Sequence, residues 1–528
     1  MSSEPENHDG GTANAARRGH CYLVGAGPGA PELVTVRGAR LLETADVVLH
    51  DELVDGALLQ SVRGDAVVRS VGRRGRDAHG KDARQQQIID EMIATVRAGR
   101  SVVRLKGGDP LLFGRGGEEA QALRAAGVPF EIVPGIASPL AVAAYAGVPL
   151  THRELARSVT FVTAVMRDGS DFDWRELSLV RGTVCVFMGK ERLAHVAASL
   201  VRHGRSPSTP AALCESASLP RQRTVTGTLA TIASVAEAAR LGSPSLLVVG
   251  EVVAMRAELR WFDALPLFGK RVLVTRPAHQ QSGTMRALRE RGAEPVSFAT
   301  IAIEPPPDAA RPLEAVRALA RGDYDLVAFT SENGVEWFFR AIEEARADAR
   351  VFGRAKVAAI GPATAARLRG RGIRADVVAR TFVAESLAEA IVPHFAEQPG
   401  ARVLLPRALV ARDALPRLLE RAGITVDVVP VYRTVGAESE RAAELRQLVA
   451  SADAVLFTSS STVDKLCELL GDDAAALLSR ATLASIGPVT TGTATSRGLD
   501  VAVTASVSTS PGLIDALEAH YARTAHAT

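Results

Sequence analysis

The second half of the chain repeats three short motifs in the same order, and this duplication limits the folds that it can adopt. Residues 271–277 resemble 402–407, residues 326–331 resemble 454–459, and residues 359–364 resemble 485–490, at offsets of 131, 128 and 126 residues. Each motif joins an apolar run to small polar residues. Repetition at nearly constant spacing predicts two similar α/β lobes, and we expect a ligand cleft between them.

The first half of the chain alternates short apolar runs with helix-like stretches. Residues 118–126 have the spacing of a helix, and the apolar runs cover residues 21–24, 46–50, 102–105, 130–133, 159–164, 183–188 and 245–251. Such alternation is typical of βαβ units around a mostly parallel sheet. We therefore expect an α/β fold in this half as well.

Two irregular segments suggest the domain boundaries. Residues 1–18 are polar and rich in glycine, asparagine and alanine, which is typical of a disordered tail. A short segment punctuated by proline and glycine precedes a new apolar run in the middle of the chain. The expected order is a tail at 1–18, a first domain at 19–262, a linker at 263–269 and a second domain at 270–521.

Composition and charge exclude several classes of protein. Of 528 residues, 47% are apolar and 23% are charged, which is ordinary for a globular protein with several cores. The 62 basic residues nearly balance the 59 acidic ones, so we expect no nucleic-acid partner. No apolar run reaches the roughly 18 residues of a membrane span. The four cysteines are scattered and show no metal-ligand spacing, so we expect a cytoplasmic protein without a metal.

Three glycine-rich segments follow predicted strands of the first half, at residues 25–29, 104–110 and 134–139. Glycine lets the backbone approach a ligand closely, because no side chain stands in the way. In the second segment, Asp109 adds a carboxylate, a combination that suits an amino-acid-like cation or a ribose. For residues 25–29 alone, a tight turn without any ligand is an equal alternative.

The glycine segments belong to a longer series of motifs between residues 19 and 262. In order, the motifs are GAGPG, LHDELV, VRLKGGDP, FGRGGEE, VPGIAS and PLTHRE. Together they resemble the uroporphyrinogen-III C-methyltransferases of the tetrapyrrole methylase family, which implies a two-lobed α/β methylase fold. The resemblance also implies methyl transfer from S-adenosyl-L-methionine to two carbons of uroporphyrinogen III, without a metal. The product, precorrin-2, serves either the cobalamin or the sirohaem pathway.

The resemblance further implies which residues contact S-adenosyl-L-methionine. By position in the motifs they are Pro28, Gly107, Gly108, Asp109, Leu112, Ala137, Ser138, Met188 and Ala217. Two of them depart from the family pattern, since Ala137 replaces a commoner threonine and Ala217 stands where glycine is frequent. Without the resemblance, Met188 is interpreted as a core residue at the end of an apolar run.

Asp51 and Arg73 are the residues that the resemblance implies for proton handling. Asp51 follows the apolar run at 46–50 and matches the family's proposed proton acceptor. Arg73 stands where the family has a lysine, its proposed proton donor. Arginine stays protonated in proteins, so we expect Asp51 to move the proton and Arg73 to act electrostatically. A structural alternative for Asp51 is a carboxylate that caps the turn between a strand and a helix.

The second half, over residues 268–520, carries the motifs VTRP, FTSENGV, IGPATA and VYRT. These resemble the uroporphyrinogen-III synthases, which have a two-lobed, internally duplicated α/β fold. In that fold the middle of the segment forms one lobe, and the first strand joins the C-terminal part in the other. The implied reaction is cyclisation of hydroxymethylbilane to uroporphyrinogen III, with inversion of ring D and loss of water.

Small polar residues after the repeated strands are the candidate substrate ligands of this half. They are Thr330, Ser331, Asn333, Gly361, Thr364, Thr458 and Ser459. Such groups donate hydrogen bonds to anions at helix N-termini, and the resemblance implies a substrate with eight carboxylates. The same hydroxyls serve equally well as helix caps. No residue of this half is assigned as catalytic.

Two other functions compete with a bifunctional enzyme. One is methylation of a different substrate, such as RNA, by the first half, although the expected basic patch is absent from the sequence. The other is a second half that binds a ligand and regulates the first without catalysis. The resemblance additionally implies a homodimer through the methyltransferase half.

Overall fold

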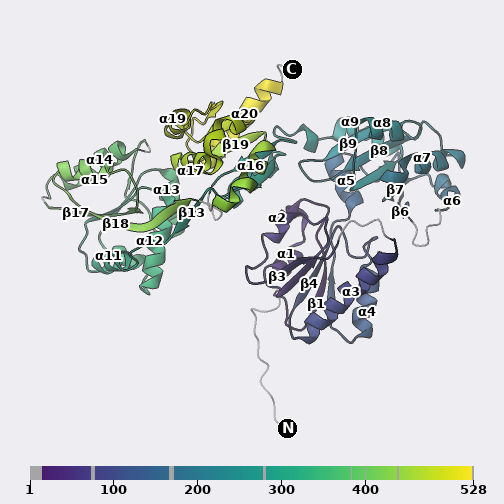
Figure 1. Cartoon of the computed structure of the whole chain (residues 1–528), viewed down its shortest axis with the longest axis horizontal. Helices are drawn as coiled ribbons and strands as arrows, with labels where there is room; N and C mark the ends of the chain where they lie inside the picture. Colours follow the sequence, from purple (N-terminus) through teal and green to yellow (C-terminus); the bar gives the residue numbers. More distant parts are fainter. Residues whose placement is uncertain are drawn as a thin grey trace, which may run out of the picture. The chain divides into compact units, whose positions relative to one another are not determined.

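The chain forms two compact units, residues 1–269 and 270–528, called unit 1 and unit 2 below. The computed structural model describes residues 15–72, 78–165, 172–276, 281–381, 383–398, 400–436 and 439–525. Each unit contains two β-sheets with helices packed against them (Figure 1). The predicted α/β fold class is confirmed for both halves.

The first sheet of unit 1 is parallel, in the order β3-β2-β4-β1-β5. Its strands are β1 (Cys21–Gly25), β2 (Val47–His50), β3 (Val67–Ser70), β4 (Val102–Lys106) and β5 (Phe130–Val133). The accompanying helices are α1 (Val36–Leu42), α2 (Gly56–Leu59), α3 (Ala78–Arg97), α4 (Gly116–Ala125) and α5 (Ser138–Ala146). Parallel strands end at the same edge of a sheet, so the loops after β1, β2, β4 and β5 lie together.

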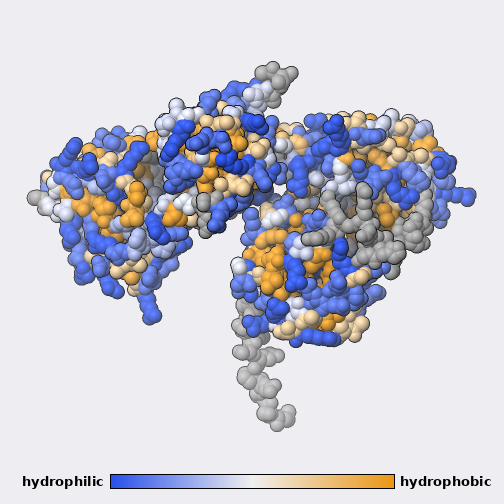
Figure 2. Space-filling model, viewed as in Figure 1, coloured by the Kyte–Doolittle hydropathy of each residue, from blue (hydrophilic) through white to orange (hydrophobic). Residues whose placement is uncertain are grey.

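Alternate residues of the strands pack into two cores on opposite faces of this sheet. Cys21 of β1 packs with Met92 of α3 in one core. Val24 of β1 packs with Leu41 of α1 in the other. Because both faces are covered, β1 is a continuous apolar run in the sequence, whereas the central strand β4 also carries Arg104 and Lys106. The edge strand β3 is exposed along its length, and Figure 2 shows apolar surface on this part of unit 1.

The second sheet of unit 1 is mixed, so the expectation of a mostly parallel sheet is wrong here. In the order β6-β7-β10-β8-β9, the described β6–β7 pair is parallel and the other pairs are antiparallel. The strands are β6 (Val159–Thr163), β7 (Thr183–Phe187), β8 (Pro210–Glu215), β9 (Arg223–Thr228) and β10 (Ser245–Val249), with helices α6 (Trp174–Leu179), α7 (Leu193–Arg202), α8 (Ile232–Ala238) and α9 (Arg256–Leu259). Residues 216–222, which join β8 to β9, are too few for a parallel crossover, so the two strands form a hairpin.

The predicted tail at residues 1–18 is too long at its C-terminal end. Ala16 N donates a hydrogen bond to Thr44 Oγ1, and Arg17 N donates one to the Tyr22 hydroxyl, both at 2.8 Å. These contacts hold the segment before β1 against unit 1. Residues 1–14 of the predicted tail lie outside the described residues.

The predicted linker at residues 263–269 belongs to unit 1. Asp263 forms an ion pair with Arg256, and the ring of Phe268 lies 5.3 Å from the ring of Phe262. Leu267 is fully buried. Because these side chains pack against unit 1, the boundary between the two units falls after Gly269.

Unit 2 has two lobes, the middle lobe with the sheet β13-β18-β17-β14-β15-β16 and the terminal lobe with the sheet β12-β11-β19-β20-β21. The middle-lobe strands are β13 (Ile301–Glu304), β14 (Leu326–Phe329), β15 (Lys356–Ala359), β16 (Val377–Val378), β17 (Arg402–Ala408) and β18 (Thr425–Gly436). The terminal-lobe strands are β11 (Arg271–Val274), β12 (Glu294–Ser297), β19 (Ala454–Phe457), β20 (Thr482–Ser485) and β21 (Val503–Thr504).

The two copies of the repeat exchange their first strands. In the terminal lobe, β11 of the first copy pairs with β19 of the second. In the middle lobe, β17 of the second copy pairs with β14 of the first. The chain therefore crosses between the lobes twice, after β12 and after β18. This confirms the strand exchange that the resemblance to the synthases implies.

Helices cover the sheets of both lobes. They are α10 (Ser282–Glu290), α11 (Ala310–Ala320), α12 (Glu332–Glu344), α13 (Pro362–Gly370), α14 (Ala384–Ile391), α15 (Ala414–Arg421), α16 (Ala442–Ala450), α17 (Ser460–Leu470), α18 (Ala474–Leu478), α19 (Pro488–Ser496) and α20 (Ser510–Ala525). The strand–helix turns β14–α12 and β15–α13 correspond to β19–α17 and β20–α19. Two of the three repeated motif pairs, 326–331/454–459 and 359–364/485–490, lie at these four turns, and the third pair lies on β11 and β17.

Candidate active sites

Four loops of unit 1 meet beyond the carboxyl edge of its first sheet. They lie at the ends of β1, β4, β5 and β8, cover residues 25–29, 107–109, 134–138 and 216–219, and are called the first to fourth loops below. The first two exchange backbone hydrogen bonds, since Gly108 N donates to Gly27 O at 2.7 Å and Gly27 N donates to Gly108 O at 3.3 Å.

Glycine is required where these loops touch backbone to backbone. A Cβ atom on Gly135 would lie 2.2 Å from Gly108 O, and a Cβ atom on Gly25 would lie 2.5 Å from Gly135 Cα. No side chain fits at such distances. Gly25, at the end of β1, therefore has a packing role that needs no ligand.

The fourth loop brings Pro28 and Ala217, two predicted cofactor contacts, to the same place. Ala30 N donates to Ser218 Oγ at 3.0 Å. A Cβ atom on Gly29, the residue after Pro28, would lie 3.3 Å from Ala217 O. The first sheet and the β8–β9 hairpin of the second sheet are thus joined at this point.

Further predicted contacts lie at the same junction. Gly107 is exposed, and a Cβ atom on Gly108 would lie 3.9 Å from Ala137 Cα and 4.0 Å from Ser138 N. Ala137 is the N-cap residue of α5 and Ser138 is its first residue. The second and third loops therefore present small residues and the start of a helix side by side.

Asp109 ties the second loop to the third. Its Oδ1 accepts a hydrogen bond from Leu111 N at 2.8 Å, and its Oδ2 accepts one from Gly135 N at 3.0 Å. Leu112 N donates to the Asp109 carbonyl at 3.4 Å. The sequence analysis assigned this carboxylate to the cofactor. In the structure it accepts hydrogen bonds from two backbone amides and so positions the loops, a role that the sequence did not reveal.

Met188 is 52% exposed at the end of β7, so its interpretation as a core residue is wrong. Its φ angle is +53°, in the left-handed region that side chains disfavour. The ring of the preceding Phe187 lies 4.8 Å from the ring of Phe113, in the segment after the second loop. An exposed methionine on strained backbone next to these loops is typical of a ligand site.

Asp51 follows β2 at the same edge and touches the second loop. Its Oδ2 accepts a hydrogen bond from Gly107 N at 3.2 Å, and its Oδ1 accepts one from Arg104 Nη2 at 2.5 Å. The side chain is 32% exposed. The capping alternative for Asp51 does not hold, because Asp55 is the residue that caps α2, through Ala57 N. Arg73, the other residue predicted for proton handling, lies outside the described residues.

Buried charged groups lie behind Asp51, and sequence reasoning missed them. Arg104 and Lys106 both lie on the central strand β4, and both contact Glu119 of α4. Burial, followed by the nearby Arg104, lowers the pKa of Lys106, while Glu119 opposes this. Charged residues at alternate positions of an otherwise apolar strand were the available signal, because they point to one face of a covered sheet.

In unit 2, two of the predicted ligands are helix caps. Ser331 Oγ accepts a hydrogen bond from Gly334 N at 2.9 Å at the start of α12. Ser459 Oγ accepts one from Thr462 N at 3.4 Å at the start of α17, in a reciprocal capping box. The capping role thus holds for both copies of the repeat, and Thr330 and Thr458 each precede a cap.

Tyr432 of the VYRT motif lies under the first of these caps. Its hydroxyl is 3.3 Å from Ser331 Oγ and also interacts with Asn333. Burial raises the pKa of Tyr432, and these two partners lower it in part. The motif carried the resemblance, but the sequence did not indicate that its tyrosine supports the turn between β14 and α12.

Gly361 and Thr364 are the least accessible of the predicted ligands in unit 2. Gly361 is the N-cap residue of α13 and is buried, and Thr364 is 4% exposed. Their backbone amides lie at a helix N-terminus, but the Thr364 hydroxyl offers little surface to a ligand. Thr490 of α19, at the equivalent place in the terminal lobe, is buried in the same way.

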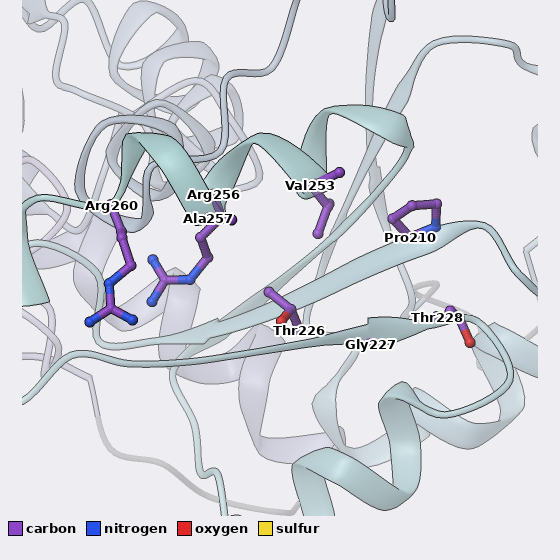
Figure 3. A pocket seen from close by; sticks show the side chains of 9 residues that line it. Pro210, Thr226, Gly227, Thr228, Val253, Arg256, Ala257 and Arg260 are labelled. Atoms are coloured by element: carbon purple, nitrogen blue, oxygen red, sulfur yellow. The ribbon is translucent and has the colours of Figure 1, made fainter.

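A surface depression of about 430 Å³ lies elsewhere in unit 1 and contains none of the predicted site residues (Figure 3). It opens between the hairpin β8–β9 and α9 and is lined by Pro210, Thr226, Gly227, Thr228, Val253, Ala254, Arg256, Ala257 and Arg260. Pro210 begins β8, whereas the fourth loop follows its end. In the parts of the chain that the structure describes, no helix has the length and apolarity to span a membrane.

Comparison with known families matches each half of the chain separately. The family described as Tetrapyrrole (Corrin/Porphyrin) Methylases matches residues 20–233, and the family described as Uroporphyrinogen-III synthase HemD matches residues 282–515. The porphyrin biosynthesis protein HemD of Ruminiclostridium josui is 33% identical over 450 residues, which are 84% of this chain and 88% of that protein.

Other relatives match somewhat less than half of the chain. The siroheme synthase of Pseudomonas fluorescens (strain Pf0-1) is 47% identical over 246 residues, 46% of this chain and 52% of that protein, so the chain spans about half the length of this relative. The uroporphyrin-III C-methyl transferase of Thermus thermophilus, whose crystal structure contains S-adenyl homocysteine, is 41% identical. That match covers 44% of this chain and 99% of the solved chain, with a TM-score of 0.39.

Proposed function

The chain belongs to the family of proteins that join a tetrapyrrole methylase to a uroporphyrinogen-III synthase, and on that premise we propose two consecutive reactions. Unit 2 cyclises hydroxymethylbilane to uroporphyrinogen III, with inversion of ring D and loss of water. Unit 1 then methylates uroporphyrinogen III at two carbons to give precorrin-2. The product of one unit is the substrate of the other, which gives the fusion a chemical reason.

S-adenosyl-L-methionine is the methyl donor in this proposal, and its methyl group on a positively charged sulfur is strongly electrophilic. The junction of the four loops suits such a ligand, because exposed Gly107 lies there and the helix start at Ser138 lies beside Gly108. The second and third loops would hold its polar part, and exposed Met188 would contact it from the end of β7. Pro28, Leu112 and Ala217 complete the proposed contacts.

Asp51 handles the proton that methylation releases. The methylated ring is a cation, and breaking one of its C–H bonds returns the electron pair to the ring and passes the proton to the Asp51 carboxylate. A partly exposed carboxylate suits this task, since the proton can then leave to solvent. Arg73 would act through its charge on a substrate carboxylate or on Asp51.

In unit 2, the turns after β14, β15 and β19 bind the carboxylates of hydroxymethylbilane. Backbone amides at the starts of α12, α13 and α17 and the hydroxyls of Thr330 and Thr458 are the proposed donors, with Asn333 beside them. Ser331 and Ser459 keep these helix starts in shape through their caps. Neutral donors of this kind suit a substrate with many negative charges, because no single ion pair fixes its position.

The observation that carries the proposal for unit 1 is the hydrogen bond from Gly107 N to Asp51 Oδ2. It joins the loop proposed for the methyl donor to the residue proposed for the proton, which lie far apart in the sequence. Reacting groups must be brought together in this way for a transfer reaction.

Separate substrates test the two halves. Supplied with uroporphyrinogen III and S-adenosyl-L-methionine, residues 1–269 should form S-adenosylhomocysteine. Supplied with hydroxymethylbilane alone, residues 270–528 should form uroporphyrinogen III. Cutting after Gly269 keeps the packed segment 263–269 on unit 1. A folded second fragment that binds hydroxymethylbilane without cyclising it would instead support the regulatory alternative.

A further inference from the structure

Asp51, Arg104, Lys106 and Glu119, called the Asp51 cluster below, extend from the carboxyl edge of the first sheet into its core. Arg104 and Lys106 are two residues apart on β4, so their side chains lie on the same face of the sheet, toward α3 and α4. The side chains of Arg104, Lys106 and Glu119 are 3%, 2% and 0% exposed. Asp51 is the member of the cluster that reaches solvent.

Arg104 is held from several sides at once. Its Nε donates to Glu119 Oε1 at 3.2 Å, and its Nη1 donates to the carbonyl oxygens of Leu49 and Leu105 at 3.4 and 3.3 Å. Its Nη2 donates to Asp51 Oδ1 at 2.5 Å. A planar guanidinium bonded in this way has one orientation, and it fixes that of the carboxylate in turn.

Glu119 holds the two buried cations in place. Its Oε1 accepts hydrogen bonds from Lys106 Nζ at 3.0 Å and from Gln85 Nε2 at 2.9 Å, in addition to the one from Arg104. Among the described residues, its buried Oε2 has no hydrogen-bond partner. The hydrogen bonds described for the Glu119 carboxylate therefore come from side chains, two of which are the buried cations, and not from the backbone around it.

The charged groups of the cluster are linked in series. Glu119 contacts both Arg104 and Lys106, and Arg104 also contacts Asp51. Because a buried charge without a partner is costly, Glu119 keeps the two cations in place behind Asp51.

We propose that Arg104, supported by Glu119 and Lys106, is a positioning residue that orients the Asp51 carboxylate for proton transfer. The inference rests on the proposed function of unit 1. A role in stability alone does not require this arrangement, since apolar residues stabilise a core as well as buried ion pairs do. What the cluster adds is a fixed cation behind a carboxylate that has one side open to solvent.

Steady-state methyl transfer by the full chain, together with calorimetry of S-adenosylhomocysteine binding, tests this role. Arg104→Gln releases the Asp51 carboxylate from its fixed orientation, so kcat should fall about tenfold or more while the affinity for S-adenosylhomocysteine stays at the wild-type value. Arg104→Lys keeps a cation at the same place and should restore part of the lost kcat. Lys106→Met removes a cation farther from Asp51, so its kcat should fall less.

Arg37→Gln is the matched control, because Arg37 forms an ion pair with Glu131 on the same sheet, at 2.8 Å, away from Asp51. It should leave kcat unchanged. A wild-type kcat in Arg104→Gln, or an equal loss of kcat in Arg104→Gln and Arg104→Lys, overturns the positioning role. Should Arg104→Gln not fold, a wild-type kcat in Lys106→Met overturns it alone. A wild-type chain that transfers no methyl group refutes the proposed function instead.

Discussion

The two units place different chemistry at the ends of their strands. In unit 1, ionised side chains gather there, and Asp51 is bonded to a buried arginine at 2.5 Å. In unit 2, the equivalent turns carry hydroxyls and amides, and two serines cap the helices that follow. In both units these residues lie at the carboxyl ends of strands, but they are charged in unit 1 and neutral in unit 2.

This difference matches what each proposed reaction needs. Proton transfer needs a carboxylate held in one orientation, and in the proposal the buried Arg104 holds Asp51 in that way. Holding a substrate with many carboxylates needs several donors that do not depend on pH, and helix starts supply them. We infer that unit 1 responds strongly to loss of single charges, whereas unit 2 responds weakly to loss of single hydroxyls.

The largest effect is expected from Asp51→Asn. The substitution keeps the shape of the side chain and removes the base, so methyl transfer should fall by about 10²–10⁴. Cyclisation of hydroxymethylbilane by the same protein should be unchanged. Asp55→Asn is the matched control, because asparagine also caps a helix and Asp55 lies in the same turn. Wild-type turnover in Asp51→Asn removes Asp51 as the base.

A smaller effect on binding is expected from Asp109→Ala. Two backbone amides, of Leu111 and Gly135, lose their acceptor, and the second and third loops lose their tie. The cost should be about 1.5–3 kcal/mol, or roughly tenfold or more in affinity for S-adenosylhomocysteine, with less effect on tetrapyrrole binding. Calorimetry measures both. Equal affinity for S-adenosylhomocysteine in wild type and variant would show that Asp109 neither binds the ligand nor shapes its site.

In unit 2, the cap and ligand roles of the first turn can be separated. Ser331→Ala removes the acceptor for Gly334 N and should lower the free energy of unfolding by about 1 kcal/mol. Ser331→Asp keeps the cap but adds a negative charge where carboxylates are proposed to bind. It should preserve stability and raise the Michaelis constant for hydroxymethylbilane about fivefold, as for a loss of about 1 kcal/mol. An unchanged Michaelis constant in Ser331→Asp contradicts carboxylate binding at this turn.

The smallest effects concern stability in alkali, where the two units should respond with opposite sign. Burial raises the pKa of Tyr432 above its ordinary 10.0, so its contribution is complete below pH 10 and is lost as the pH rises further. Burial and Arg104 lower the pKa of Lys106 below its ordinary 10.5, so unit 1 gains stability as the pH rises toward that value. Urea unfolding of each unit beside Tyr432→Phe and Lys106→Met measures both slopes, and equal slopes in wild type and variant contradict the assignment.

Much of the fold could be predicted from the sequence because its signals are local. Parallel strands that are covered on both faces are mostly apolar, so their runs could be located in the sequence. The repeat in unit 2 predicted two similar lobes. The hairpin β8–β9 was missed because β9 (Arg223–Thr228) has few large apolar residues and is only partly buried. Its antiparallel pairing follows from a short loop rather than from the composition of either strand.

Less of the site could be predicted, because its key contacts join distant segments. The hydrogen bonds that Arg104 donates to Asp51 and that Gly135 N donates to Asp109 depend on strand order, which the sequence does not state. The resemblance assigned Met188 to the cofactor, whereas its apolar surroundings alone indicated a core residue; it is exposed and lies on left-handed backbone. The resemblance to known families supplied residue names, whereas the structure supplies their partners.

Mass spectrometry of the products formed from hydroxymethylbilane and S-adenosyl-L-methionine by the purified full chain tests the central claim most directly. The account predicts a cyclised tetrapyrrole that has gained two methyl groups, together with two equivalents of S-adenosylhomocysteine. Omission of S-adenosyl-L-methionine should leave unmethylated uroporphyrinogen III. A product without added methyl groups, or a failure to cyclise hydroxymethylbilane when uroporphyrinogen III is methylated normally, contradicts the claim that the two units catalyse consecutive reactions.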